Sequence, residues 1–214
     1  MSSRCLAVAA QPVRHPISGW GASLKFLEDY LIGALVLLAF LPLMLLIALA
    51  VKLDSKGPVI FRQTRHGLNR QEITVFKFRT MIDTASGDVT QARRNDPRVT
   101  RTGKVLRRFS LDELPQLFNV LRGEMALVGP RPHAVQHTGY FEALVERYDS
   151  RHRVKPGITG WAQVNGLRGS TPTWEQIRRR IEHDLYYIDH WSIWFDLRIL
   201  AMTPFKGFFH ENAF

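Results

Sequence analysis

The chain has 214 residues, enough for one ordinary domain and an accessory element but hardly for two full domains. Its formal net charge of +10 and pI near 10.2 call for an anionic partner, which is a nucleic acid, an anionic membrane surface or a phosphorylated substrate. The single cysteine, Cys5, excludes an internal disulfide framework and a thiolate metal cluster, which suits a reducing compartment.

An apolar segment lies near the N-terminus. From Tyr30 to Val51 the sequence YLIGALVLLAFLPLMLLIALAV has 22 residues and no charge. As a helix it is about 33 Å long, close to the thickness of a bilayer's hydrocarbon core. A buried helix of a soluble protein would normally carry a polar stripe, and this one has none. We therefore predict a membrane-inserted helix over residues 28–52, in preference to a soluble core helix.

Pro42 in the middle of this helix removes a backbone hydrogen bond and clashes with the carbonyl of Leu38, which predicts a kink. Basic residues favour the cytoplasmic side of a membrane. They flank the segment on both sides: Arg4, Arg14, Lys25, Lys52, Lys56, Arg62, Arg65 and Arg70. A kinked, re-entrant helix that returns to one face and a straightforward spanning helix with a tolerated proline both fit this pattern.

The rest of the chain has the texture of a compact α/β (α+β) domain, rich in helix and with small sheet elements. Val59–Phe61 and Glu72–Met81 are strand candidates, and alternation along the second places Lys77 and Arg79 on one face. Further along the chain we expect a short helix over 112–122, a strand in MALVGPRP, a helix over 134–149, a glycine-rich loop in KPGITGWAQVNG and a helix over 174–190.

The tail WSIWFDLRILAMTPFKGFF is rich in tryptophan and phenylalanine beside basic residues. This composition fits an amphipathic helix at a membrane interface, and equally a C-terminal helix that packs on the core. The predicted organisation is a basic segment over 1–27, the membrane helix over 28–52 and one domain over 53–214.

Two adjacent acids, Asp112 and Glu113, stand in SLDELPQLFNV directly after a basic stretch. Residues 93–108 contain six arginines and one lysine against one aspartate. Helix capping is one explanation of the acids: Ser110 and Glu113 match a capping box, and a cap at Asp112 would place Pro115 in the tolerated first turn.

A phosphoryl-transfer site is the other explanation. A helix N-terminus attracts anions, and the basic side chains of Lys77, Arg79, Arg107, Arg108 and Arg131 would complete a phosphate pocket. A carboxylate in such a pocket can ligate Mg²⁺ together with substrate phosphates, or attack phosphorus as a nucleophile. Each motif is a weak signal by itself. Their occurrence together, after a predicted membrane helix, is therefore what supports a phosphoryl-transfer site.

Four segments carry a family resemblance: KFRTM (77–81), RRFSLDELPQLFNVLRGEMALVGPRP (107–132), KPGITGWAQVNG (155–166) and DLYYIDHWSIWFDLRIL (184–200). From about residue 28 to the end, the chain resembles the bacterial sugar transferases, the monotopic phosphoglycosyl transferases. The resemblance implies transfer of a sugar phosphate from a nucleoside diphosphate sugar to a polyprenyl phosphate, with release of the nucleoside monophosphate. This reaction is the first membrane step in the assembly of exopolysaccharide, O-antigen and other glycans.

The resemblance also implies roles for residues. Asp112 is the expected nucleophile, and it shares the Mg²⁺ site with Glu113. Asp196 falls in a matching segment without a clear role, and Leu41-Pro42 stands where the family's re-entrant helix breaks at a Ser-Pro pair. The expected phosphate-binding residues are Lys77, Arg79, Arg107 and Arg131.

The expected partners follow from that reaction. They are a UDP-sugar, undecaprenyl phosphate and the lipids of the bacterial inner membrane, with the catalytic domain on the cytoplasmic face. The ending FKGFFHENAF weakly favours UDP-glucose or UDP-galactose, and a homodimer is compatible with the aromatic, basic surface. A non-catalytic membrane scaffold and a basic nucleic-acid-binding protein are the alternatives, although the sequence contains no recognised nucleic-acid-binding motif.

Overall fold

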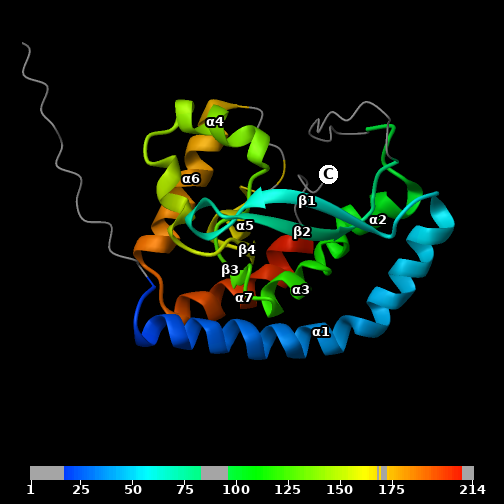
Figure 1. The fold of residues 1–214 in the computed structure, drawn as a ribbon, viewed down its shortest axis with the longest axis horizontal. Helices are drawn as coiled ribbons and strands as arrows, with labels where there is room; N and C mark the ends of the chain where they lie inside the picture. Colours follow the sequence, from blue (N-terminus) through cyan, green and yellow to red (C-terminus); the bar gives the residue numbers. More distant parts are fainter. Residues whose placement is uncertain (1–16, 83–95, 168, 170–172, 209–214) are drawn as a thin grey trace, which may run out of the picture.

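The computed structural model describes residues 17–82, 96–167, 169 and 173–208. The predictions that concern Arg4, Cys5, Arg14, residues 93–95 and the last six residues lie outside this part of the chain. The fold is rich in helix with two small sheets, as the composition and patterning predicted (Figure 1). The α-helices are α1 (Trp20–Asp54), α2 (Arg101–Arg108), α3 (Gln116–Leu121), α4 (Val135–Leu144), α5 (Trp161–Val164), α6 (Trp174–Asp189) and α7 (Ile193–Phe208).

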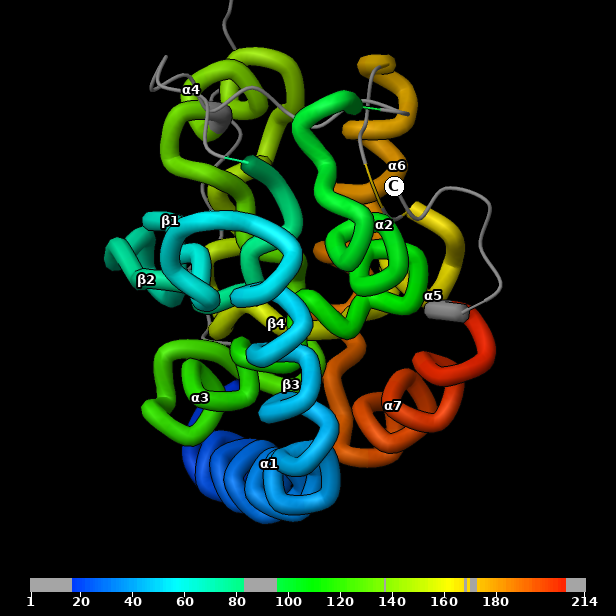
Figure 2. Tube along the Cα trace, turned by 90° about the vertical axis from the view of Figure 1, so that its right-hand side faces the viewer, coloured from blue at the N-terminus to red at the C-terminus, as the bar shows by residue number. Residues whose placement is uncertain are grey.

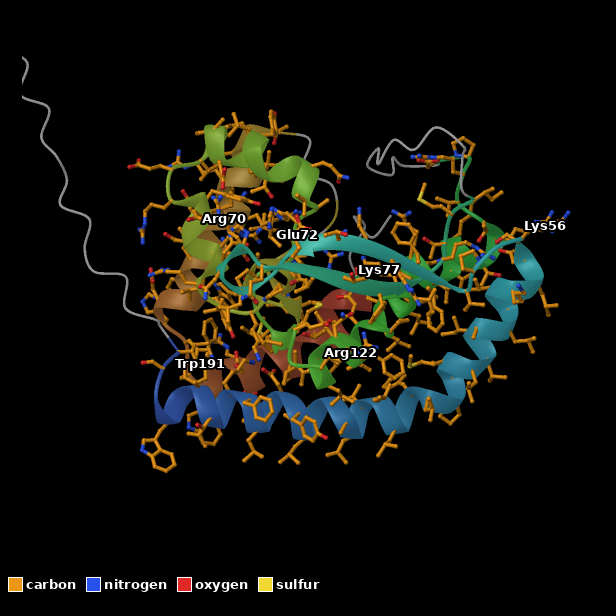
Figure 3. All side chains as sticks on the ribbon, viewed as in Figure 1. Lys56, Arg70, Glu72, Lys77, Arg122 and Trp191 are labelled. Atoms are coloured by element: carbon orange, nitrogen blue, oxygen red, sulfur yellow. The ribbon has the colours of Figure 1, made fainter. Side chains whose placement is uncertain are left out.

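The first helix, α1, runs along one whole side of the molecule and bends toward the rest of the fold in its C-terminal part (Figure 1). It is assigned as one continuous helix with Pro42 inside, and proline is the usual cause of such a bend. Only 17% of its most apolar 18-residue stretch is buried. This low burial argues against a soluble core helix and indicates membrane association. Figure 3 shows its side chains projecting on the side turned away from the domain.

The helix begins at Trp20, eight residues before the predicted boundary, because its first turns are polar on the side that faces the protein. Lys25 and Asp29 are buried there, and the same face continues with Gly33, where Val120 of α3 packs closely. Viewed along α1, the helices α3 and α7 lie over it (Figure 2). The helix is therefore packed on the domain along its length.

The two sheets have two strands each. In the first, β1 (Ile60–His66) and β2 (Glu72–Phe78) pair antiparallel, with Phe61 opposite Lys77. The hairpin turn contains the 3₁₀ helix η1 (Leu68–Arg70), in which Asn69 and Arg70 both have positive φ angles. In the second, β3 (Ala126–Val128) pairs parallel with β4 (Gly157–Thr159). These short sheets hold the loops that build the site.

The core lies between α1, the sheets and the last two helices. One cluster contains Val75, Leu117, Val128, Tyr187 and Ile199. A second cluster joins the C-terminal half of α1 to β2 and α2 through Met44, Ile47, Val51, Phe78 and Leu106. Both halves of α1 thus contribute to burying apolar surface of the domain.

Two predicted helices are shorter than expected. Residues 112–122 divide into the 3₁₀ helix η2 (Leu111–Glu113) and α3, because Pro115 cannot continue a helix that began before it. Residues 134–149 divide into α4 and the 3₁₀ helix η3 (Tyr148–Arg153), and Arg147 has a positive φ angle at the break. The helix predicted over 174–190 is found as α6.

The aromatic tail combines the two arrangements that the sequence left open. Asp196 and Ile199 of α7 are fully buried against the core. Trp194 and Phe205 of the same helix are 80% and 71% exposed, and Trp191 lies beside the first turns of α1 (Figure 3). The helix packs on the core with one side and presents aromatic rings on the other, so contact of that side with a membrane interface stays a prediction.

Candidate active site

The chain reaches the acid pair through a sharp turn. Helix α2 ends at Arg108, and Ser110 adopts a left-handed conformation with φ 57°. This turn directs η2 back across the end of β2, and α3 follows after Pro115. The side chain of Ser110 makes no capping hydrogen bond, and Asp112 lies inside η2 instead of capping a helix. Neither capping explanation of the acids is realised.

Glu113 is held by two cations from two other segments. Lys77 of β2 donates from Nζ to Oε1 at 2.9 Å, and Arg131, in the loop after β3, donates from Nη1 to Oε2 at 3.1 Å and from Nη2 to Oε1. The Glu113 side chain is 7% exposed, and those of Lys77 and Arg131 are 16% and 19% exposed. Three of the predicted site residues are therefore brought together from distant parts of the chain.

Asn119 of α3 fixes the distance between the acids and β2. Its Nδ2 donates to the carbonyl oxygen of Thr74 at 2.7 Å, and its Oδ1 accepts from the backbone N–H of Phe76 at 3.1 Å. The side chain is fully buried. Because these contacts bracket Val75 and end one residue before Lys77, they hold that lysine against Glu113.

Asp112 differs from its neighbour in having no hydrogen-bond or ion-pair partner among the described residues. Its carboxylate is only partly buried and makes no hydrogen bond or ion pair with any residue in the described part of the chain. Burial raises its pKa above the ordinary value, the charge of Glu113 acts in the same direction, and the cations Lys77, Arg107 and Arg131 oppose this shift. Within the described part of the chain, this carboxylate without a hydrogen-bond partner lies next to a firmly held one and is available for chemistry.

Burial also acts on the surrounding cations. It lowers the pKa of Lys77, while the charge of Glu113 favours the ammonium form. For Arg131 the attraction of Glu113 outweighs burial and raises the pKa. Lys77, Glu113 and Arg131 thus form a compact charged unit, in which the charge of Glu113 stabilises the charged form of both cations.

The other two predicted phosphate ligands lie differently. Arg107 of α2 acts electrostatically on Asp112 and contacts the sulfur of Met81 at 3.3 Å. Arg79 is buried at the end of α1, where its guanidinium donates to the carbonyl oxygens of Val51, Ser55 and Pro58. The structure therefore gives Arg79 carbonyl partners in the last turn of α1 and just after its end, and does not bring it to the acid pair.

Sequence reasoning missed one cation near the pair. Arg65 of β1 donates to Gln63 and to the carbonyl oxygen of Pro132, directly after Arg131. Burial and the charge of Arg131 lower its pKa to about 10. Alternation along β1 would have placed its side chain on a face, but its proximity to the acids depends on a contact 67 positions away.

Asp196, which had no assigned role, belongs to a buried charged cluster that attaches α1. It accepts from Tyr187 at 2.8 Å and from Trp191 at 2.9 Å, and it forms an ion pair with Lys25 at 2.8 Å. Lys25 also binds Asp29, which accepts from the backbone N–H of Leu127 in β3 at 2.8 Å. The contacts of Asp196 are thus structural and connect the membrane helix with the strand that precedes Arg131.

The residues present fit a magnesium ion whose coordination is completed by phosphate oxygens of the substrate. The described residues contain no group of three or more His, Cys, Asp or Glu side chains able to enclose a metal. Mg²⁺ is commonly held by one or two carboxylates together with substrate phosphates, and Asp112 has oxygen atoms available for this. The acid pair therefore suits a phosphate-bound Mg²⁺ and does not form a complete metal cage.

Acids, cations and a long apolar helix thus occur together in one fold, and sequence comparison identifies the family to which the chain belongs. The chain belongs to the bacterial sugar transferase family, which it matches over residues 20–210. The match includes the membrane helix, the acid pair and α7.

Individual relatives are highly similar. The chain is 55% identical over 200 residues to the UDP-glucose:undecaprenyl-phosphate glucose-1-phosphate transferase of Escherichia coli (strain K12), covering 93% of this chain and 43% of that protein. It is 51% identical to the protein of the same name from Caulobacter vibrioides, covering 89% of this chain and 72% of that protein. A UDP-N-acetylgalactosamine-undecaprenyl-phosphate N-acetylgalactosaminephosphotransferase of Aeromonas hydrophila is 43% identical over 176 residues. The chain spans about two fifths of the length of the first of these relatives.

Proposed function

We propose that this protein transfers glucose-1-phosphate from UDP-glucose to undecaprenyl phosphate, giving undecaprenyl-diphosphate-glucose and UMP. The observation that carries the proposal is the contrast between the two acids: Glu113 is held by Lys77 and Arg131, while the Asp112 carboxylate beside it has no partner among the described residues. Family membership and the names of the relatives support the same reaction.

In the first half-reaction, an oxygen of Asp112 attacks the phosphorus that carries the sugar. The new bond joins the aspartate oxygen to phosphorus, and the bond from this phosphorus to the oxygen that bridges the two phosphates breaks. UMP leaves with the bridging oxygen, and the sugar phosphate stays on Asp112 as an acyl phosphate. The charges of Lys77, Arg107 and Arg131 act on Asp112, which supports the proposal that they offset negative charge on the phosphate oxygens during this step.

In the second half-reaction, an oxygen of the lipid phosphate attacks the same phosphorus. The bond between Asp112 and phosphorus breaks, so the carboxylate is regenerated and the lipid carries the sugar as a diphosphate. Splitting the transfer into two displacements lets a soluble donor and a membrane-bound acceptor use one small site in turn. Bound Mg²⁺, held through Asp112 and Glu113 with substrate phosphates, would supply charge neutralisation in this site.

Glucose is the proposed sugar because three relatives that are 52–55% identical to this chain carry UDP-glucose in their names. A relative from Aeromonas hydrophila, 43% identical over 176 residues, carries UDP-N-acetylgalactosamine in its name instead. A panel of UDP-sugars therefore decides the donor.

We also propose that α1 is re-entrant and that the domain lies on the cytoplasmic face of the inner membrane. Lys25 and Asp29 near its start contact α7 and β3, and Met44, Ile47 and Val51 near its end pack on Phe78 and Leu106. A helix that crossed the bilayer would carry one end to the far side, away from the domain, so contacts at both ends favour return to one face.

Topology is tested by labelling single cysteines in a Cys5→Ser background. With cysteine at Ser18 or at Lys56, a membrane-impermeant maleimide added to spheroplasts should label neither position until the cells are permeabilised. Labelling of one position in intact spheroplasts would show a spanning helix instead.

The reaction is tested by measuring UMP release from UDP-glucose, UDP-galactose and UDP-N-acetylgalactosamine with undecaprenyl phosphate and Mg²⁺. We expect UMP release with UDP-glucose and its loss in Asp112→Asn, with the radiolabelled sugar phosphate retained on wild-type protein when the lipid is omitted. Full activity of Asp112→Asn would refute the nucleophile, and no release from any donor would favour the non-catalytic scaffold.

A further inference from the structure

A buried ion pair lies behind the loop that carries Arg131. Arg151 of η3 donates from Nη2 to the backbone carbonyl oxygen of Arg131 at 2.7 Å and to Oδ2 of Asp184, in α6, at 2.7 Å. Both side chains of the pair are only 2% exposed. Neither residue forms a hydrogen bond or ion pair with Asp112 or Glu113 in the described part of the chain, and the proposed reaction makes no use of them.

Stability alone does not account for this pair. Removing two charges from water costs roughly as much as their attraction returns, and a well-packed apolar pair would often serve a core as well. Moreover, Nε of Arg151 is buried and has no hydrogen-bond partner in the described part of the chain. The guanidinium is thus oriented so that Nη2 binds both Asp184 and the Arg131 carbonyl oxygen, while Nε is left without an acceptor in the described part of the chain.

The Arg131 loop is held at successive carbonyls. Gly157 of β4 donates to the carbonyl oxygen of Pro130 at 3.0 Å, Arg151 to that of Arg131, and Arg65 to that of Pro132. The Arg131 side chain leaves this fixed backbone toward Glu113, which it contacts through both nitrogens of its guanidinium fork. Such a two-point contact is sensitive to small displacements of the backbone from which the side chain starts.

From this geometry we propose that Arg151 and Asp184 are positioning residues that act through Arg131, on the understanding that the proposed function holds. Asp184 fixes the guanidinium of Arg151, Arg151 fixes the backbone of Arg131, and Arg131 then orients Glu113 beside the nucleophile. Loss of the pair displaces the Arg131 guanidinium while Lys77, Asp112 and the substrates are unchanged.

The main test uses the full chain in lipid nanodiscs with the double substitution Arg151→Met and Asp184→Leu, which removes both charges and leaves neither partner buried alone. We expect the kcat for UMP release from UDP-glucose to fall roughly 10- to 100-fold. KM for UDP-glucose should change by less than about threefold, because the contact matters chiefly when charge develops. The milder Asp184→Asn, which keeps an acceptor for Arg151, should retain more activity than the double variant.

A double-mutant cycle distinguishes positioning from a general structural effect. In an Arg131→Ala background, the Arg151 and Asp184 substitutions should lower kcat by less than about twofold further, because the residue through which they act is already gone. Equal losses with and without Arg131 would overturn the proposal. Arg178→Met with Glu182→Gln, an exposed ion pair on the same helix, is the matched control and should leave kcat unchanged.

Hydrogen exchange provides a second readout that does not depend on the reaction. The backbone amides of Gly129, Arg131, His133 and Ala134 should exchange faster in the double variant, while those of α6 away from Asp184 keep their wild-type rates. Unchanged exchange in this loop would overturn the proposal even if activity fell. An inactive wild type with accelerated loop exchange in the variant would refute the proposed function alone.

Discussion

The substitution Asn119→Ala tests how the active site is attached to the hairpin. The side chain satisfies one N–H and one carbonyl on the outer edge of β2, at Phe76 and Thr74, and it is fully buried. Removing it leaves both backbone groups without their partners, at about 1.5 kcal/mol each, so the free energy of unfolding should fall by about 3 kcal/mol. For a chain of this size this corresponds to a drop in unfolding midpoint of roughly 6–12 °C.

Thermal unfolding of the nanodisc-embedded protein, followed by circular dichroism, measures this midpoint. Asn165→Ala is the matched control: Asn165 is exposed and its Nδ2 makes one hydrogen bond, to the carbonyl oxygen of Trp161 at 2.7 Å. Its midpoint should fall by less than about 2 °C. UMP release by Asn119→Ala, assayed well below its midpoint, should also decline because Lys77 loses its fixed distance to Glu113. Similar midpoints for both variants would refute the bridging role of Asn119.

Three further outcomes are expected. Arg79→Met should lower the unfolding midpoint by several degrees, because the carbonyl groups at the end of α1 lose their hydrogen-bond donors. At low temperature the variant should still release UMP with a normal KM for UDP-glucose. A large rise in this KM would instead support the phosphate-binding role of Arg79. Gly157→Ala should prevent folding, because a Cβ there would lie 2.1 Å from the backbone nitrogen of Gly129, and normal expression with normal activity would contradict this. Because burial and the charge of Glu113 raise the pKa of Asp112, activity should rise with pH until the Asp112 carboxyl ionises. Glu113→Gln removes one of these causes, so the rise in the pH profile of its residual activity should move to lower pH. An unchanged pH profile would exclude Asp112 as the titrating group.

The elements with strong local patterns were predicted from sequence. The apolar run of α1, the strand candidates of the hairpin and the helix over 174–190 were all found, because each depends on periodicity within a short window. The boundaries that shifted did so for tertiary reasons. The start of α1 extends to Trp20 because its charged residues have partners in the domain, which no local pattern reveals.

The candidate site was predictable in part. The acid pair and the three cations Lys77, Arg107 and Arg131 lie near one another as proposed from the sequence. Arg79 does not join them because β2 ends at Phe78, so the alternation that placed it beside Lys77 no longer applies. Arg65 was missed because its contact near Arg131 comes from a loop far along the chain, and sequence spacing carries no signal for it.

The buried ion pair between Lys25 and Asp196 has a consequence for the position of the acid pair relative to α1. Through this ion pair α1 is a rigid part of the domain. A helix joined to the domain only by a flexible linker would be free to move relative to it. If α1 lies in a membrane as proposed, the fold itself sets the height of Asp112 above the lipid, and no connecting segment can change it by thermal motion. A phosphate group at a constant depth in the membrane would then meet Asp112 at a constant level. A protein cut after Asp54 would lose this fixed height and the apolar side chains that cover Phe78 and Leu106.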